Sequence, residues 1–144
     1  GGSMAKQVYI NLPVNDLERS TKFYEALGFT KNPTFSDENA SALMWSEEIV
    51  FMLLTRDFYQ KFLGSKTIAH TLTSNAALIA LTLDSKEAVQ KFADTAKANG
   101  GDYFVADPNK DLDFMFGYEV LDPDGNQLEP VWMDPNFDPQ SHSE

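Results

Sequence analysis

Near the start of the chain the spacing of apolar residues changes from every second residue to every third or fourth, which predicts a strand followed by a helix. From residue 8 to 14 apolar and polar residues alternate, the pattern of a strand with one buried face. Asp16 can cap a helix whose apolar side recurs at i, i+3, i+4 and i+7, through Ser20, Phe23, Tyr24 and Leu27. Gly28 then ends the helix. Short strands near 30–35, 42–46 and 49–55 complete a strand–helix–three-strand unit.

The second half of the chain predicts the same order of elements. Residues 78–83 alternate again, and Ser85 can cap a helix with buried positions at Val89, Phe92, Ala93 and Ala96. Strands are predicted near 102–106, 114–121 and 127–133. The run Asp122-Pro-Asp-Gly125 predicts a tight hairpin, because proline presets φ and glycine accepts a positive φ.

These two units are related by a constant spacing of 69 residues. Segments 10–25 and 79–94 share the identical pairs Ile10/Ile79, Leu12/Leu81, Glu18/Glu87, Lys22/Lys91 and Phe23/Phe92. Roughly one identity is expected from average composition. A fixed period indicates one supersecondary unit used twice, so we expect the functional site where the halves meet. The predicted organisation is a first module over 4–55, a connector over 56–76 that could act as a lid, a second module over 77–133 and a tail over 134–144.

Composition narrows the partners and the location that we expect. The net charge of −11 argues against nucleic acid, whose binding depends on Lys and Arg neutralising phosphates. The absence of cysteine excludes disulfides and thiolate metal sites. No apolar run approaches the roughly 18 residues of a membrane span, so we expect no membrane partner and a cytoplasmic location.

Two motifs at opposite ends of this repeat resemble those of the vicinal oxygen chelate superfamily. They are Leu12-Pro-Val-Asn-Asp-Leu-Glu-Arg-Ser20, continued by Phe23-Tyr-Glu and Leu27-Gly-Phe, and Asp122-Pro-Asp-Gly-Asn-Gln-Leu-Glu129. That group includes glyoxalase I, extradiol dioxygenases, and fosfomycin and bleomycin resistance proteins. The resemblance implies an α+β fold in which two βαβββ modules form a curved mixed sheet around a pocket, with helices on the outer face. It also implies a homodimer.

In the metal-dependent members of that superfamily four ligands project into the pocket. The resemblance places these positions at Tyr9, Met52, Leu78 and Glu129. At three of them a phenol, a thioether and an alkyl chain stand where a hard divalent cation needs oxygen or imidazole donors. We therefore expect no metal ion and no other cofactor. His70 lies in the connector without a partner at ligand spacing, and His142 lies in the tail.

Strand alternation adds further pocket candidates. Asn11 continues the face of Tyr9, Ala80 continues the face of Leu78, and Phe116 and Tyr118 are expected as aromatic walls. Glu129 has two interpretations. It is either an inherited carboxylate bonded to Tyr9 or to water, or a carboxylate in an apolar cavity that acts as a base or holds a cation.

Three functions are consistent with these residues. The favoured one is a metal-free protein that binds a small organic ligand, aromatic or cationic, in an apolar pocket with one carboxylate. The alternative is a metal-dependent glyoxalase, a lyase, or an enzyme like the extradiol dioxygenases. The third is a metal-free enzyme in which Glu129 is the base and Tyr9 the acid. The sequence leaves open whether the protein is an enzyme.

Overall fold

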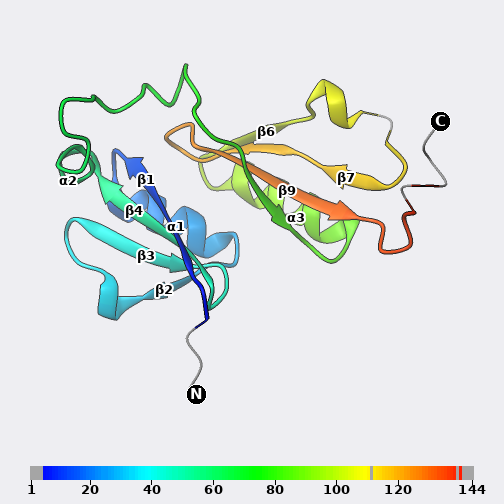
Figure 1. Cartoon of the computed structure of the whole chain (residues 1–144), viewed down its shortest axis with the longest axis horizontal. Helices are drawn as coiled ribbons and strands as arrows, with labels where there is room; N and C mark the ends of the chain where they lie inside the picture. The colour runs from blue at the N-terminus through cyan, green and yellow to red at the C-terminus, as the bar shows by residue number, and fades with distance from the viewer. Residues whose placement is uncertain (1–4, 111, 139, 141–144) are drawn as a thin grey trace.

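The first half of the chain forms a four-stranded mixed sheet with one helix packed on it (Figure 1). The computed structural model describes residues 5–110, 112–138 and 140. In this half the elements are β1 (Val8–Val14), α1 (Leu17–Ala26), β2 (Thr30–Asn32), β3 (Ala40–Met44) and β4 (Ile49–Thr55). The strand order is β1-β4-β3-β2, and β1 runs parallel to β4. Strand β1 is therefore an edge strand, a position that tolerates Pro13 because an edge strand leaves one side unpaired.

The second half repeats this topology. Its elements are β5 (Ile79–Thr82), α3 (Lys86–Ala98), β6 (Asp102–Phe104), β7 (Met115–Gly117), β8 (Glu119–Leu121) and β9 (Gln127–Met133). The order is β5-β9-β8-β6, with β7 also paired to β9 and β5 parallel to β9. Strands β7 and β8 both pair antiparallel with β9. The pairing continues without a shift between them, because the Tyr118 amide donates to the Pro130 carbonyl at 3.2 Å. The predicted α+β fold of two βαβββ modules is confirmed, with the strands divided between two sheets.

Local signals explain where the main helices begin and end. The Asp16 carboxylate accepts a hydrogen bond from the Arg19 amide, and the Ser85 hydroxyl accepts one from the Ala88 amide. Gly28 follows α1 with φ of +106°, a conformation that favours glycine. These caps are as predicted.

Three short helical turns complete the described elements. They are η1 (Pro33–Phe35), α2 (Arg56–Gln60) and η2 (Asp107–Asn109). The strand expected over 30–35 is wrong at its end, because Pro33 begins a 3₁₀ turn that is capped by the Asn32 side chain. Helix α2 follows β4 directly and begins the connector, and the Thr55 hydroxyl caps it by accepting from the Phe58 amide. No helix in the described part of the chain is long and apolar enough to cross a membrane.

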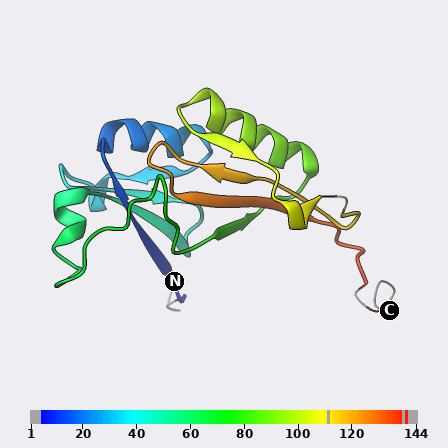
Figure 2. The same cartoon turned by 90° about the horizontal axis from the view of Figure 1, so that it is seen from above.

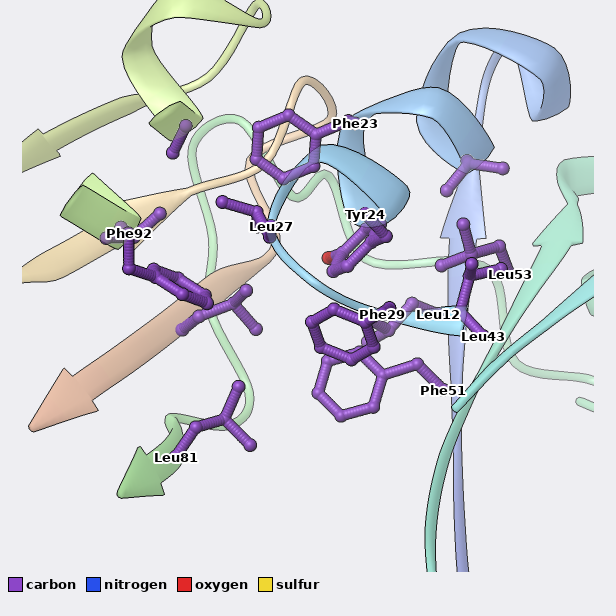
Figure 3. Packing of buried hydrophobic residues seen from close by; sticks show 14 of the residues in the cluster. Leu12, Phe23, Tyr24, Leu27, Phe29, Leu43, Phe51, Leu53, Leu81 and Phe92 are labelled. Carbon is purple, nitrogen blue, oxygen red and sulfur yellow. The ribbon is translucent and has the colours of Figure 1, made fainter. Parts of the chain in front are cut away.

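Helices α1 and α3 lie on the same side of the strands (Figure 2). Their apolar faces meet in one core, which Figure 3 shows from close by. In it Phe23 of α1 and Leu27, which follows that helix, lie near Phe92 of α3. The two modules therefore share a core, and the faces of the sheets that point away from these helices are left for other contacts.

A second link between the modules is the Asp122–Gly125 hairpin, which docks on the N-terminal end of α1. The Asp124 carboxylate accepts from the Asn15 amide at 2.9 Å and from the Ser20 hydroxyl at 3.1 Å. The Asp122 carboxylate accepts from the Tyr24 hydroxyl at 2.8 Å. Both carboxylates are buried, so the hairpin motif holds the second module against the first.

Candidate functional site

The face of the second sheet that points away from α3 carries a row of side chains from four strands. Register pairs Phe104 of β6 with Glu119 of β8, and Ala80 of β5 with Glu129 of β9. The β8–β9 pairing of Val120 with Leu128 places Glu119 opposite Glu129. Val120 and Leu128 are buried in the helix-side core, so this row lies on the other face, which we call the open face.

Glu119 and Glu129 form an acid pair at the centre of the open face. Glu119 is only 3% exposed, and its Oε1 accepts a hydrogen bond of 2.7 Å from Gln127 Nε2. Its Oε2 is buried and has no hydrogen-bond partner. Burial raises the pKa of Glu119 to about 7, opposed by the bond from Gln127 and reinforced by the facing Glu129 carboxyl. Near neutral pH the pair can therefore hold one proton between its two carboxyl groups.

A cavity of about 390 Å³ lies on the open face, and neither Glu119 nor Glu129 is among its lining residues. Phe104, Leu121 and Gln127 of the open face line it, and residues 71–75 of the connector line it from the other side. A second cavity, of about 380 Å³, also contacts Gln127 and lies against residues 10–13 of β1. The connector thus contributes lining residues to both cavities.

The hairpin positions this connector through Gly125. The Thr71 hydroxyl donates to the Asp124 carbonyl, and a Cβ added at Gly125 would lie 2.4 Å from the Thr71 carbonyl oxygen. Gly125 also has φ of +88°. Two independent constraints therefore require glycine at this position.

We predict that Gly125→Ala lowers the free energy of unfolding by about 1–3 kcal/mol and loosens the connector. Gly64→Ala is the matched control, because Gly64 has φ of +63° but open space around its Cβ position. Urea unfolding gives the stability, and amide hydrogen exchange at 71–75 reports the connector. Equal effects of the two substitutions on both measurements would contradict the contact with Thr71.

Among the sequence-predicted site residues, Leu78, Ala80 and Glu129 come together in the second sheet. Leu78 precedes β5 and is exposed, and Ala80 pairs directly with Glu129. Tyr9, Asn11 and Met52 belong to the first sheet, where Asn11 pairs with Met52. Asn11 also lines the second cavity. The four positions suggested as ligand sites thus lie in two pairs on two different sheets.

The structure does not bring Phe116 and Tyr118 to the open face. Their register on β9 places them on the helix side with Val120, and the Tyr118 hydroxyl donates to Gln90 Oε1 of α3 at 2.6 Å. The expectation that they form pocket walls beside Glu129 therefore does not fit their placement. His70 is exposed, and His142 lies outside the described residues.

Glu119 is the site residue that sequence reasoning missed, although a signal for it exists. The Asp122 amide donates to the Asn126 carbonyl, which fixes the register of the hairpin. Counting outward from that pair places Glu119 opposite Glu129. The residue opposite Glu129 is thus a second acid, Glu119, on the next strand. Tyr9, which was expected as a possible hydrogen-bond partner of Glu129, lies on the other sheet.

The donor set does not fit the metal that the fold resemblance implies. Tyr9, Met52 and Leu78 offer a phenol, a thioether and an alkyl chain, and only the first can supply an oxygen. Within residues 5–110, 112–138 and 140, no three or more His, Cys, Asp and Glu side chains gather as a metal site would need. We therefore derive no chemistry through a metal ion.

Comparison with known proteins identifies relatives for the first module and for the whole fold. Residues 6–43 match the model of the bleomycin resistance protein-like N-terminal family. A hypothetical protein from S. aureus has a TM-score of 0.70 at 23% identity, and the match covers 90% of this chain and 95% of that one. No curated protein sequence matches the chain.

Two further solved structures carry family names. A glyoxalase/bleomycin resistance protein/dioxygenase family enzyme from Burkholderia phytofirmans has a TM-score of 0.71 at 20% identity, covering 90% of this chain and 99% of that one. A glyoxalase/bleomycin resistance protein from Albidiferax ferrireducens has a TM-score of 0.63 at 25% identity, covering 90% and 98%. The N-terminal match and the two-module fold confirm the resemblance to the glyoxalase/bleomycin resistance/dioxygenase superfamily that the sequence motifs indicate.

Proposed function

We propose that this protein is a metal-free binding protein that holds a small organic ligand on the open face of its second sheet. The observation that carries the proposal is a cavity of about 390 Å³ on the open face, whose lining residues Leu121 and Gln127 lie on the same strands as the acid pair of Glu119 and Glu129. Apolar side chains surround the pair, among them Phe104, which is 49% exposed. A cavity with apolar walls and a few polar groups is typical of small-molecule sites.

The three residues that replace metal ligands support binding over metal chemistry. Tyr9, Met52 and Leu78 offer aromatic, thioether and alkyl surface, which suits contact with an organic ligand. The Albidiferax protein is named a glyoxalase/bleomycin resistance protein. For this chain we propose small-molecule binding in general and not bleomycin as the ligand.

We further propose that a second copy of the chain completes the site. Strands β1 and β5 are edge strands, and exposed edges favour pairing with another chain. Large apolar side chains stand exposed at these edges, namely Val8, Tyr9 and Leu78. A homodimer would cover them and could bring Tyr9 and Met52 of one chain toward Glu129 of the other.

We predict that the protein is a dimer that binds aromatic ligands at one site per chain. Light scattering coupled to size exclusion measures the mass, and isothermal titration calorimetry with indole, benzyl alcohol and benzoate measures binding. We expect a Kd of roughly 0.1–10 mM for the two neutral compounds, a range set by their size. Benzoate should bind much more weakly, because its carboxylate would face the acid pair.

Two substitutions test whether the ligand binds near Glu129. Glu129→Gln changes the acid pair and should alter the preference for neutral compounds over benzoate, whereas Glu47→Gln, at an exposed turn of the first module, should not. Elemental analysis of protein purified without chelator provides the opposing outcome. Stoichiometric zinc, nickel or iron together with turnover of a carbonyl or catechol substrate would replace this proposal with the metal-dependent alternative.

A further inference from the structure

A third cavity, of about 270 Å³, lies between the first sheet and residues 59–63 at the start of the connector. Leu12 and Leu53 belong to the core beneath α1, so their neighbours Asn11 and Leu54 face the opposite side of the sheet. Helix α2 lies on that side (Figure 2). The side chains that close the cavity around Asn11 are Leu54, Tyr59, Phe62 and Leu63. Its walls are therefore mainly hydrophobic.

The third cavity meets the second cavity at two polar side chains. Asn11 and Tyr59 line both cavities, and the second one extends from them along the connector, where Ser74 and Asn75 line it. Within the described part of the chain, the side chains of these four residues make no hydrogen bond to protein. Their amide and hydroxyl groups are therefore available to a ligand or to water. An apolar compartment thus adjoins a polar one.

Among the described residues, none that lines the second or third cavity is charged. Charged residues make up 23% of the sequence, so several would be expected by chance in lining sets of this size. The cavity on the open face differs, because Asp102 and Asp122 line it. An ion that left water for the second or third cavity would find no counter-charge there, and burying an unpaired charge is costly. The lining therefore favours an uncharged ligand.

These cavities are separate from the positions at which the resemblance places metal ligands. Tyr9, Met52, Leu78 and Glu129 line neither of them. The second cavity shares part of the connector with the cavity on the open face, but no residue of the third cavity lines that one. Substitutions in the third cavity can therefore be made without changing the walls of the cavity on the open face.

We propose that the second and third cavities together bind an uncharged amphiphile, with its apolar chain in the third cavity and its hydroxyl-bearing head in the second. The chain contacts Leu54, Phe62 and Leu63, and burial of apolar surface drives binding. The head exchanges hydrogen bonds with Asn11 and Tyr59. Several hydroxyl groups suit this lining, because amides and hydroxyls both donate and accept. This inference goes beyond the proposed function, which concerns the open face.

NMR titration of the isotope-labelled full chain with four matched probes tests this inference. The probes are hexyl glucoside, hexanoate, hexylammonium and methyl glucoside, in about 0.15 M salt to screen the net charge of −11. We expect hexyl glucoside to bind with a Kd of roughly 0.1–10 mM. The two ions should bind at least about tenfold more weakly, because each brings an unpaired charge. Methyl glucoside lacks the chain and should also bind at least about tenfold more weakly.

The position of the signals and two variants locate the ligand. Hexyl glucoside should shift the amide signals of residues 54 and 59–63 most. Phe62→Ala should weaken its binding about fivefold or more. Phe35→Ala is the matched control, because Phe35 is 60% exposed against 68% for Phe62 but lines neither cavity. Tyr59→Phe removes only a hydroxyl and should weaken binding about two- to tenfold.

Four outcomes would overturn the inference. The first is no detectable binding of hexyl glucoside, and the second is equal affinity for it and the two ions. The third is a set of shifts confined to the open face around Phe104 and Leu121, which would place the probe in the site of the proposed function. The fourth is a Phe62→Ala variant that loses dimerisation in light scattering and binds hexyl glucoside unchanged, which would show that a second copy covers the third cavity. Binding of indole at the open face is measured separately and stands or falls independently.

Discussion

Replacing Asp122 with alanine is expected to lower the free energy of unfolding by about 3–5 kcal/mol. Asp122 is 3% exposed, and it is one of two hairpin carboxylates that bond the first module. It receives hydrogen bonds from the Tyr24 hydroxyl, the Asn126 side chain and the amides of Asp124 and Asn126. The substitution leaves these buried donors without an acceptor. A buried donor without a partner lowers the free energy of unfolding by about 1–3 kcal/mol.

Urea unfolding followed by fluorescence measures this loss. Tyr24→Phe removes a single donor of the same cluster and should cost about 1–2 kcal/mol. Asp107→Ala is the matched control, because its side chain is 91% exposed, and it should change stability by less than about 0.5 kcal/mol. If Asp122→Ala behaved like Asp107→Ala, the hairpin would not hold the modules together.

The second large effect concerns the dependence of stability on pH. Burial and the facing Glu129 carboxyl raise the pKa of Glu119 from 4.5 to about 7 in the folded chain. The folded state therefore binds more protons than the unfolded state between these pH values, and stability falls as pH rises from about 4.5 to 7. We expect a loss of about 1–2 kcal/mol, reduced from the full linkage value because water reaches the partly buried Glu129 and screens its charge.

Glu119→Gln should remove this loss, because the amide imitates the protonated carboxyl and can donate to Glu129. The variant should match the parent near pH 5 and be about 1–2 kcal/mol more stable near pH 8. Urea unfolding at both pH values checks this, with Glu47→Gln as the control at an exposed position. A parent protein whose stability is flat over this range would show that Glu119 titrates normally.

Local signals predicted much of the fold, because they act through near neighbours. The caps at Asp16 and Ser85 and the periodic burial of both helices follow from residues within one or two turns. The repeat predicted that the two modules would share a topology, and β1 on β4 matches β5 on β9. The end of β2 was missed because Pro33 favours a 3₁₀ turn over a continued strand.

The candidate site was only partly predictable, because it depends on register between distant strands. Nearly every residue from 114 to 121 is apolar or aromatic, so alternation alone did not show which of them face α3. The wrong face was assigned to Phe116 and Tyr118, and Glu119 was overlooked. Only the hairpin register decides this, since a shift of one residue exchanges the two faces.

Carbon-13 NMR of the Glu119 side-chain carboxyl tests the central claim most directly, that Glu119 and Glu129 form an acid pair on the open face. The carboxyl signal is followed through a pH titration of the parent chain and of Glu129→Gln. The account predicts a midpoint near 7 in the parent chain and a lower midpoint in the variant, because the facing carboxyl is one cause of the raised pKa of Glu119. A midpoint at the ordinary value of glutamate in the parent chain would contradict it.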